Sequence, residues 1–383
     1  MADTAESRKS TGIVIAGTGL FVPPFSISNT ELVAAYNQYV AFYNQAHQAD
    51  ILAGSLVALE ESSAPFIEKA SGIEHRYVMD KAGILNPQVM HPLLVERSDD
   101  VLSVQAEMAV KSALDALVQA GKTASDVDLL IVACSNLQRA YPAMSIEIQQ
   151  ALGTGGYAFD MNVACSSATF GIKAAVDALS NGSAKTALVI NPEICSAHLE
   201  WKDRDCHFIF GDVSTALVLE KKETCHAKES FEIISSRLKT SFSNNIRNNF
   251  GFLNRCSPET RFARDKTFKQ NGRKVFKEVV PWVSELILAH LASEGVSADQ
   301  LRRLWLHQAN INMNDLIAKK VLGREPSNLE APNILKEFAN TSSAGSMIAF
   351  HQYRHDLAGG DLGIICSFGA GYSAGSLLVQ KVC

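Results

Sequence analysis

The sequence predicts an α/β protein of five layers, αβαβα, built from two copies of one unit. Its 383 residues exceed a single ordinary core, and 47% of them are hydrophobic while 20% are charged, as in globular proteins. Segments with helical spacing of apolar residues alternate with continuous apolar segments typical of buried strands. This order of segments occurs twice. We therefore expect a largely parallel sheet in each half, covered on both faces and stacked through shared central helices.

The first copy is clearest at residues 109–136, AVKSALDALVQAGKTASDVDLLIVACSN, where a helix, a Gly-containing stop, a Ser/Asp turn and a strand follow one another. Residues 280–310, VPWVSELILAHLASEGVSADQLRRLWLHQAN, repeat that order. Further on, TALVINPEICS is echoed by LGIICSFGAGYS, and STALVLEKK by SAGSLLVQK. The polar stretch KKETCHAKESFE, near residues 221–232, indicates a boundary between an N-terminal half, 1–225, and a C-terminal half, 226–383.

Cysteine usage and hydropathy limit the class of protein. The eight cysteines form no CxxC pair, which in a reducing compartment indicates free thiols, and we expect no metal site and no cofactor. No apolar run has the length of a membrane span, and the first residues, MADTAESRKSTG, lack the hydrophobic stretch of a signal peptide. We therefore expect a cytoplasmic protein that does not act at a membrane. The cysteines are Cys134, Cys165, Cys195, Cys206, Cys225, Cys256, Cys366 and Cys383.

Charge is unevenly distributed along the chain. The net charge of −5 gives no reason to expect a nucleic-acid partner. Between Arg255 and Lys277, however, the sequence RCSPETRFARDKTFKQNGRKVFK holds eight basic residues against two acidic ones. This segment is either a solvated surface or a docking patch for an acidic partner.

The stretch VACSSATFGIKAAV, residues 163–176, places a cysteine where a strand turns into a helix. The N-terminus of a helix carries unpaired N–H groups and about half a positive charge, and both favour a thiolate over a thiol. Buried cysteines more often only fill space, so this position alone does not establish a nucleophile. Two other polar residues follow apolar strands in the second copy: His307 in LWLHQAN and Asn340 in EFANTSSAG. In the repeat, Asn340 falls close to the counterpart of Cys165, which predicts a thiol facing two hydrogen-bonding side chains.

Several ordered motifs together resemble one family. They are VACSSATFGI, LHQANINMNDLIAKKVLG, FANTSSAG, FIFGDVSTALVL and ICSFGAGYSAGS, and the resemblance runs from GIVIAGTGLFVP, residues 12–23, to the C-terminus. The chain resembles a β-ketoacyl-acyl-carrier-protein synthase III, a condensing enzyme of the thiolase superfamily. This resemblance implies a thiolase-like αβαβα fold and an acyltransferase that forms carbon–carbon bonds in fatty-acid or secondary-lipid and polyketide synthesis.

The resemblance also implies a role for each of three side chains. Cys165 would accept an acyl group as a thioester. His307 and Asn340 would donate hydrogen bonds to the thioester carbonyl of a malonyl-type extender and stabilise the enolate left when CO2 departs. The backbone N–H groups of Cys165 and Ala370 would form the oxyanion hole. In this family the residue at position 370, between Gly369 and Gly371, is usually glycine, but alanine keeps the N–H.

Neighbouring families differ at identifiable positions. Degradative thiolases use a second cysteine where this chain has Ser367, and the adjacent Cys366 should face away from Cys165 because strand side chains alternate. Synthases of the I/II type have a second histidine where this chain has Asn340. A chalcone-synthase-like enzyme shares the Cys, His and Asn and stays an alternative. So do an acyltransferase that passes the acyl group to another nucleophile and a non-catalytic partner subunit of a ketosynthase heterodimer.

Substrate-binding positions depart in part from the family pattern. The tryptophan and arginines that hold coenzyme A correspond to Phe66, Ala70 and Ala197, which weakens the case for a coenzyme A primer. Lys277, Lys319 and Lys320 match positions that dock acyl carrier protein, whereas the arginine expected after QAN is Asn312. Because carrier proteins are acidic, the basic segment then favours docking.

Two further features bear on the acyl chain and on assembly. The chain has extra residues between about 28 and 100, either a surface elaboration or a wall for a longer acyl chain. This long form is similar to enzymes that make dialkylresorcinols from medium-chain acyl and β-ketoacyl thioesters. Tyr141 matches the aromatic residue that crosses the dimer interface into the partner's acyl pocket in this family, so we expect a homodimer.

Overall fold

The computed structural model describes residues 10–382, so Cys383 lies outside the described residues. One mixed sheet runs through it, with strand order β11-β12-β13-β8-β1-β7-β6-β4-β5. These strands are β1 (Ile13–Phe21), β4 (Leu129–Ala133), β5 (Tyr157–Met161), β6 (Thr186–Ile194), β7 (Asp212–Lys221), β8 (Phe231–Thr240), β11 (Leu301–Leu306), β12 (Leu362–Gly369) and β13 (Ser373–Lys381).

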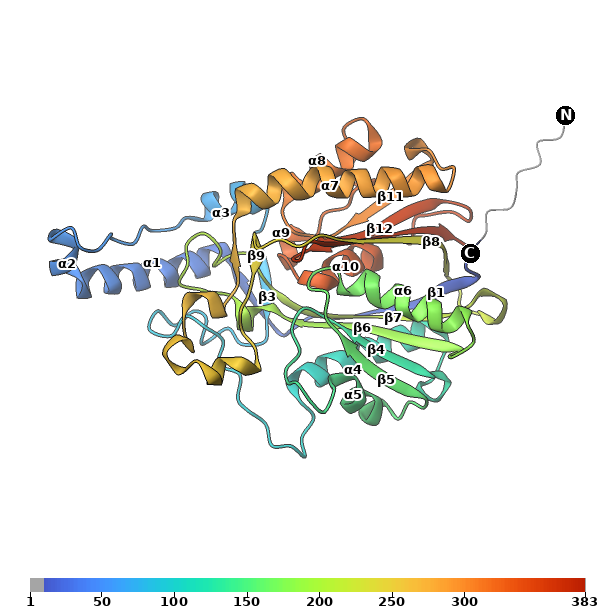
Figure 1. The fold of residues 1–383 in the computed structure, drawn as a ribbon, viewed down its shortest axis with the longest axis horizontal. Helices are drawn as coiled ribbons and strands as arrows, with labels where there is room; N and C mark the ends of the chain where they lie inside the picture. Colours follow the sequence, from blue (N-terminus) through green and yellow to red (C-terminus); the bar gives the residue numbers. More distant parts are fainter. Residues whose placement is uncertain (1–9, 383) are drawn as a thin grey trace.

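The N-terminal and the C-terminal strands of this sheet form two layers, and helices outside and between them make five layers in all (Figure 1). The helices are α4 (Val104–Ala120), α5 (Met144–Leu152), α6 (Ser167–Ser180), α7 (Gly272–Ser293), α8 (Ile311–Leu322), α9 (Leu335–Phe338) and α10 (Gly345–Gln352). α4 and α5 cover the outer face of the N-terminal strands, α7 and α8 cover the outer face of the C-terminal strands, and α6 and α10 lie between them. The two sets of strands meet where β1 pairs with β8 through only two residue pairs. The predicted αβαβα fold with two similar halves is confirmed.

The prediction of largely parallel sheets is wrong. Only the β4–β5, β4–β6 and β11–β12 pairs are parallel, and the other pairs in this sheet are antiparallel. Between β12 and β13 the chain has three residues, 370–372, which suffice for an antiparallel hairpin but not for the crossover that parallel strands need. Apolar patterning showed that these strands are buried but did not show their direction.

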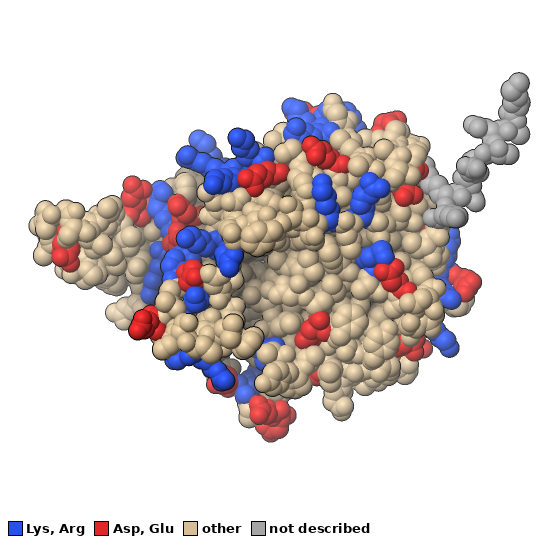
Figure 2. Space-filling model, in the orientation of Figure 1, with Lys and Arg blue, Asp and Glu red and all other residues tan. Residues whose placement is uncertain are grey.

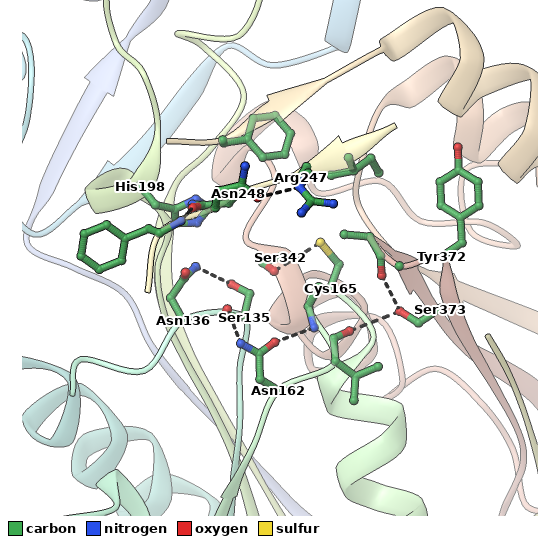
Figure 3. A pocket seen from close by; sticks show the side chains of 18 of the residues that line it. Ser135, Asn136, Asn162, Cys165, His198, Arg247, Asn248, Ser342, Tyr372 and Ser373 are labelled. Atoms are coloured by element: carbon green, nitrogen blue, oxygen red, sulfur yellow. Dashed lines mark hydrogen bonds between the residues drawn. The ribbon is translucent and has the colours of Figure 1, made fainter. Parts of the chain in front are cut away.

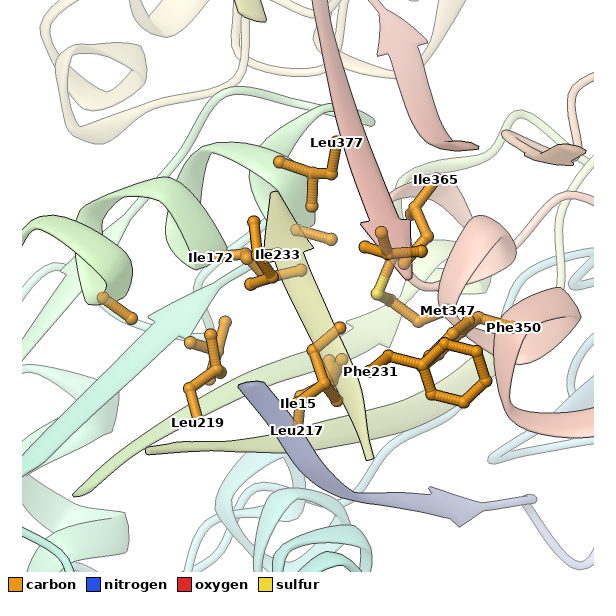
Figure 4. Packing of buried hydrophobic residues seen from close by; sticks show 14 of the residues in the cluster. Ile15, Ile172, Leu217, Leu219, Phe231, Ile233, Met347, Phe350, Ile365 and Leu377 are labelled. Atoms are coloured by element: carbon orange, nitrogen blue, oxygen red, sulfur yellow. The ribbon is translucent and has the colours of Figure 1, made fainter. Parts of the chain in front are cut away.

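The central layer holds the main core (Figure 4). Ile172 on α6 and Met347 and Phe350 on α10 pack between strands of both halves. The rings of Phe231 and Phe350 meet edge to face with centroids 5.0 Å apart. Each such buried aromatic side chain contributes about 2–3 kcal/mol by removing apolar surface from water. This shared core fixes the two halves to each other, and with them the loops at their strand ends.

The extra segment forms an arm. β2 (Phe25–Ser28) leads into α1 (Asn29–Ala46) and α2 (Gln48–Leu52), which project from the body, and α3 (Ala64–Ser71) and β3 (His75–Val78) return to it. Ser28 caps α1 in a reciprocal bond with Glu31, which fixes where the helix begins. In the part of the chain that the structure describes, no helix is long and apolar enough to cross a membrane.

Candidate active site

Cys165 lies in the turn between β5 and α6, as predicted. Ala164 just before it has a positive φ of 47°, a left-handed conformation that costs a non-glycine residue about 1–2 kcal/mol. Side-chain bonds hold this turn: Asn162 Oδ1 accepts the Ala164 N–H at 2.8 Å, and the Ser166 hydroxyl donates to the Ser373 carbonyl at 2.9 Å. Gly369 passes so close that a Cβ there would lie 2.6 Å from the Cys165 Cβ. The position of Cys165 therefore requires a glycine at 369.

Burial opposes the thiolate that the start of a helix favours at Cys165. Burial raises the pKa of the Cys165 thiol to about 11, despite hydrogen bonds from the Ser342 hydroxyl and from backbone N–H groups. The Ser342 hydroxyl lies 3.3 Å from Sγ. The backbone N–H groups of Ala370 and Cys165 also lower this pKa, which places both predicted oxyanion-hole donors beside the sulfur. Desolvation outweighs the helix N-terminus, so the thiol is protonated at neutral pH.

His307 follows β11 and is held as a neutral imidazole. Its backbone N–H donates to the Cys366 carbonyl at 2.7 Å, and its ring meets that of Phe368 edge to face at 5.1 Å. Burial lowers the pKa of His307 to about 4, an effect that a backbone hydrogen bond with Ser342 partly offsets. A neutral imidazole carries one N–H, so His307 can donate one hydrogen bond to a ligand.

Asn340 is fixed through both its backbone and its side chain. Its N–H donates to the Ile209 carbonyl at 3.0 Å, and its carbonyl accepts the Gly211 N–H at 3.1 Å. Its Oδ1 accepts the Ser342 N–H at 2.9 Å. With Oδ1 engaged, the Nδ2 group is left to donate, and it has no partner among residues 10–382. The FIFGD segment, residues 208–212, thus positions the asparagine of the other half.

Sequence analysis missed a buried carboxylate that links the two halves beneath this site. Glu193, at the end of β6, accepts from the Ser135 N–H at 3.0 Å and hydroxyl at 2.6 Å, and from the Ser343 N–H at 3.1 Å and its hydroxyl. Burial raises the pKa of Glu193. An acidic residue near the end of the buried strand, in LVINPEI, was the available signal. This carboxylate ties the segment after Asn340 to the first half of the fold.

Two cavities meet at Cys165. A smaller cavity of about 400 Å³ is lined by Cys165, His307 and Asn340, which brings the three predicted catalytic residues together. A larger cavity of about 750 Å³ holds Cys165, Ser342 and Ala370 on one side (Figure 3). Phe210, Phe268 and Ile246 line both cavities. Cys366 lines neither of them, because it packs in the core of the C-terminal half, as predicted.

One aromatic ring that lines the smaller cavity is in contact with an arginine. Phe66 lines it, and the Arg204 guanidinium lies 4.5 Å from the centre of that ring. Ala197 is exposed and lines neither cavity. Arg204, from a different position in the chain, therefore stacks directly on Phe66, and the sequence-based view of a weakened coenzyme A site stays a prediction.

The predicted docking lysines are exposed. Lys277 lies on α7, and Lys319 and Lys320 lie on α8, while Arg273, also on α7, lines the smaller cavity. Figure 2 shows basic side chains gathered over α7 and α8. Lys319 also pairs with Glu325. Tyr141 is 84% exposed and lines neither cavity of its own chain.

The sequence of this chain is similar to those of known proteins. The profile of 3-oxoacyl-[acyl-carrier-protein] synthase III matches residues 159–241, and its C-terminal profile matches residues 291–381. A β-ketodecanoyl-[acyl-carrier-protein] synthase of Pseudomonas aeruginosa is 56% identical over 347 residues, 91% of this chain and 99% of the relative. A β-ketoacyl-[acyl-carrier-protein] synthase III of Agrobacterium fabrum is 30% identical over 323 residues, 84% of this chain and 91% of the relative.

Solved structures of low sequence identity share the fold. The 3-oxoacyl-[acyl-carrier-protein] synthase III of Aquifex aeolicus has a TM-score of 0.74 at 23% identity, covering 96% of this chain and 99% of that one. The priming β-ketosynthase of the R1128 polyketide pathway has a TM-score of 0.75 at 19% identity, covering 99% and 98%.

Proposed function

The chain belongs to the 3-oxoacyl-[acyl-carrier-protein] synthase III family, and from that premise we propose which residues carry its reaction and which acyl chain it extends. It is a condensing acyltransferase of fatty-acid synthesis that forms carbon–carbon bonds, as predicted. The finer similarity to enzymes that make dialkylresorcinols stays a prediction. The observation that carries the proposal is that Cys165, His307 and Asn340 all line the smaller cavity.

The first step loads the acyl group on Cys165. The thiol gives up its proton, Sγ attacks the carbonyl carbon of an acyl thioester, and the carrier thiol leaves with that proton. The N–H groups of Cys165 and Ala370 stabilise the oxyanion of the tetrahedral intermediate. The pKa of about 11 for Cys165 means that the thiolate forms within the substrate complex and not in the resting enzyme.

The second step joins the two chains. A malonyl thioester loses CO2, and the electron pair of the broken bond becomes an enolate whose oxygen accepts hydrogen bonds from His307 and Asn340. The enolate carbon attacks the acyl-Cys165 carbonyl, and collapse of the intermediate expels the Cys165 thiolate and releases a β-ketoacyl thioester. The low pKa of His307, about 4, fits a neutral donor and not a general acid.

The acyl group is of medium length in this proposal. The Pseudomonas aeruginosa relative is named for a β-ketodecanoyl product, and a ten-carbon product arises when a two-carbon unit is added to an eight-carbon primer. A cavity of about 750 Å³ beside Cys165 is within the usual size of small-molecule sites. Carrier protein would dock on Lys277, Lys319 and Lys320, which are exposed on α7 and α8.

A homodimer completes the proposal. β5 is an edge strand of the sheet, and its Tyr157 and Phe159 are 43% and 37% exposed. An exposed edge with aromatic side chains favours pairing with a second copy. Tyr141 would then enter the partner's larger cavity. Phe159→Lys should convert a dimer into a monomer in light scattering, and a wild-type monomer at micromolar concentration would contradict this part.

Intact-protein mass spectrometry tests the acyl specificity. The enzyme is incubated with acyl-coenzyme A and acyl-carrier-protein panels from acetyl to dodecanoyl, with Cys165→Ala as the control. We expect an adduct that is largest near octanoyl and absent from the control. A maximum at acetyl would contradict the medium-chain proposal, and an adduct that persists in the control would contradict Cys165 as the nucleophile.

A further inference from the structure

An imidazole without a partner lies in the wall of the larger cavity. His198 ends a short 3-10 turn, Cys195–His198, that follows β6. Both of its ring nitrogens are buried, and neither has a hydrogen-bond partner among residues 10–382. Its backbone carbonyl accepts the Phe268 N–H at 2.8 Å, which anchors the residue in place. The ring is therefore held against the cavity by its own backbone and is left unsatisfied there.

In the described chain, the side chains around His198 are aromatic and supply no hydrogen-bond partner for its ring. Its ring packs against the rings of Phe210, at 5.2 Å, and Phe268, at 6.5 Å, the two aromatic residues that line both cavities. Burial lowers the pKa of His198 to about 4, an effect that its own backbone carbonyl partly offsets, so the ring is neutral and carries one donor and one acceptor. A buried polar group without a partner is unfavourable, and an alkyl chain lying beside this ring cannot supply one.

Other polar atoms face the same part of the cavity. In Figure 3, His198 lies across the cavity from Cys165, with Asn136 and Asn248 beside it. The Asn136 amide donates to the Ser135 hydroxyl at 3.0 Å, and the Asn248 Oδ1 accepts the Phe250 N–H at 2.8 Å. The remaining Asn136 oxygen and Asn248 amide nitrogen have no partner within the described chain. The region remote from the nucleophile thus offers hydrogen bonds in a cavity that also has aromatic walls.

We propose that the acyl chain this enzyme prefers carries an oxygen function, a hydroxyl or keto group, that hydrogen-bonds to His198. The inference rests on the proposed function, because it assumes that the larger cavity holds the acyl group of Cys165. A hydroxyl matches the neutral imidazole best, since it can accept from one ring nitrogen or donate to the other. Phe210 and Phe268 would contact the hydrocarbon between the thioester and that oxygen.

The test compares matched eight-carbon primers. Octanoyl-coenzyme A and its 3-, 5- and 7-hydroxy isomers are each mixed with enzyme, and the rate of adduct formation on Cys165 is followed by intact-protein mass spectrometry. We expect at least one hydroxy isomer to load about tenfold faster than octanoyl, as a single well-placed hydrogen bond provides. Equal or slower loading of all three isomers overturns the inference.

Three variants identify the group responsible. His198→Phe fits an aromatic surrounding and should remove the hydroxy advantage while octanoyl still loads. His198→Asn keeps a donor and an acceptor and should restore part of the advantage. Tyr141→Phe removes the hydroxyl that would enter the same cavity from a second copy and keeps its ring. Persistence of the advantage in His198→Phe overturns the inference, as does a fall in octanoyl loading shared by His198→Phe and Tyr141→Phe, since the imidazole then pairs with Tyr141 of a second copy.

Failure of the two proposals gives different results. If no thioester forms an adduct with wild-type enzyme, the proposed function fails and takes this inference with it. If octanoyl loads Cys165 but the hydroxy isomers show no advantage, the proposed function stands and only the role of His198 is overturned.

Discussion

Each half of the molecule has a turn in which an alanine with positive φ precedes a residue of the candidate site, but the two turns present different chemical groups. Cys165 in the first half and Asn340 in the second each follow an alanine with positive φ, 47° at Ala164 and 57° at Ala339. The strand β5 leads to Cys165, whereas the four-residue helix α9 leads to Asn340. One turn therefore presents a reactive atom at the start of a long helix, and the other presents a fixed hydrogen-bond donor.

The difference follows from how each turn is held. Asn340 is 7% exposed, and its backbone N–H and carbonyl are both bonded to the segment before β7. Cys165 is held chiefly through neighbouring side chains, and its sulfur reaches both cavities. A donor stabilises a transition state only if it is already in place, whereas a nucleophile must be accessible from more than one side. The repeated turn thus acquires separate roles from its surroundings.

The largest expected effect separates these roles. His307→Ala and Asn340→Ala should each lower the rate of condensation by about 10²- to 10³-fold, because each removes one donor to the enolate. Both variants should still form the acyl adduct on Cys165. Radiolabelled product formation and intact mass, measured on the same samples, check both statements. Equal loss of loading and condensation would mean that the second half also takes part in acylation.

The contact between the halves gives the next largest effect. Gly369→Ala introduces a Cβ that would lie 2.6 Å from the Cys165 Cβ, so the nucleophile must move, and acylation should fall by about 10²-fold. Gly359→Ala is the matched control, since the nearest atom to its Cβ would be a backbone oxygen at 3.4 Å. Unchanged acylation in Gly369→Ala would show that the turn adapts freely.

The pH dependence of Cys165 gives an intermediate effect. The thiolate is the reactive form and the pKa is about 11, so iodoacetamide alkylation of Cys165 should rise about tenfold per pH unit between pH 7 and 10. Ser342→Ala removes a hydrogen bond that lowers this pKa and should slow alkylation about three- to tenfold at a given pH. Peptide mapping resolves Cys165 from the other thiols. A plateau below pH 8 would mean that the resting enzyme holds a thiolate.

The smallest effect concerns the two alanines. Ala164→Gly and Ala339→Gly each relieve a backbone with positive φ, and the gain exceeds the extra entropy of the unfolded chain, so each should stabilise the protein by about 0.5–1 kcal/mol. Urea unfolding of the two variants measures the difference. If only one is stabilised, the two turns do not store comparable strain, and the comparison between halves holds for their shape alone.

The candidate site could be predicted where residue type and position carry the chemistry. Cys165, His307 and Asn340 each follow an apolar segment, and the repeat itself indicated that they meet. Arg204 could not be found in this way, because its contact with Phe66 joins distant parts of the chain. The raised pKa of Cys165 was missed for another reason: proximity to a helix is visible in the sequence, but the burial that outweighs it depends on tertiary packing.

In the fold, too, the sequence predicted what depends on local pattern and missed what depends on tertiary arrangement. Hydrophobic periodicity predicted which segments are strands and which are helices, and the repeat predicted the five layers. Strand direction depends on how each connection closes, and the three residues at 370–372 decided it where periodicity did not. Whether the arm around α1 forms a wall for a longer acyl chain stays a prediction. Of residues 28–100, Phe66, Ala70 and Ser71 line a cavity beside Cys165, and these lie in α3 and not in α1.

In the proposed reaction, the meeting of two cavities at Cys165 sets the order of events during turnover. Once the acyl chain moves into the larger cavity, the smaller one, with His307 and Asn340, is vacant for the second thioester. The first carrier must therefore depart before the second arrives, which gives ping-pong kinetics with parallel double-reciprocal plots. An excess of the malonyl thioester should inhibit, because it can occupy the smaller cavity of an enzyme that has not yet been loaded. The geometry around Cys165 would thus determine the order in which the two thioesters bind as well as the reaction itself.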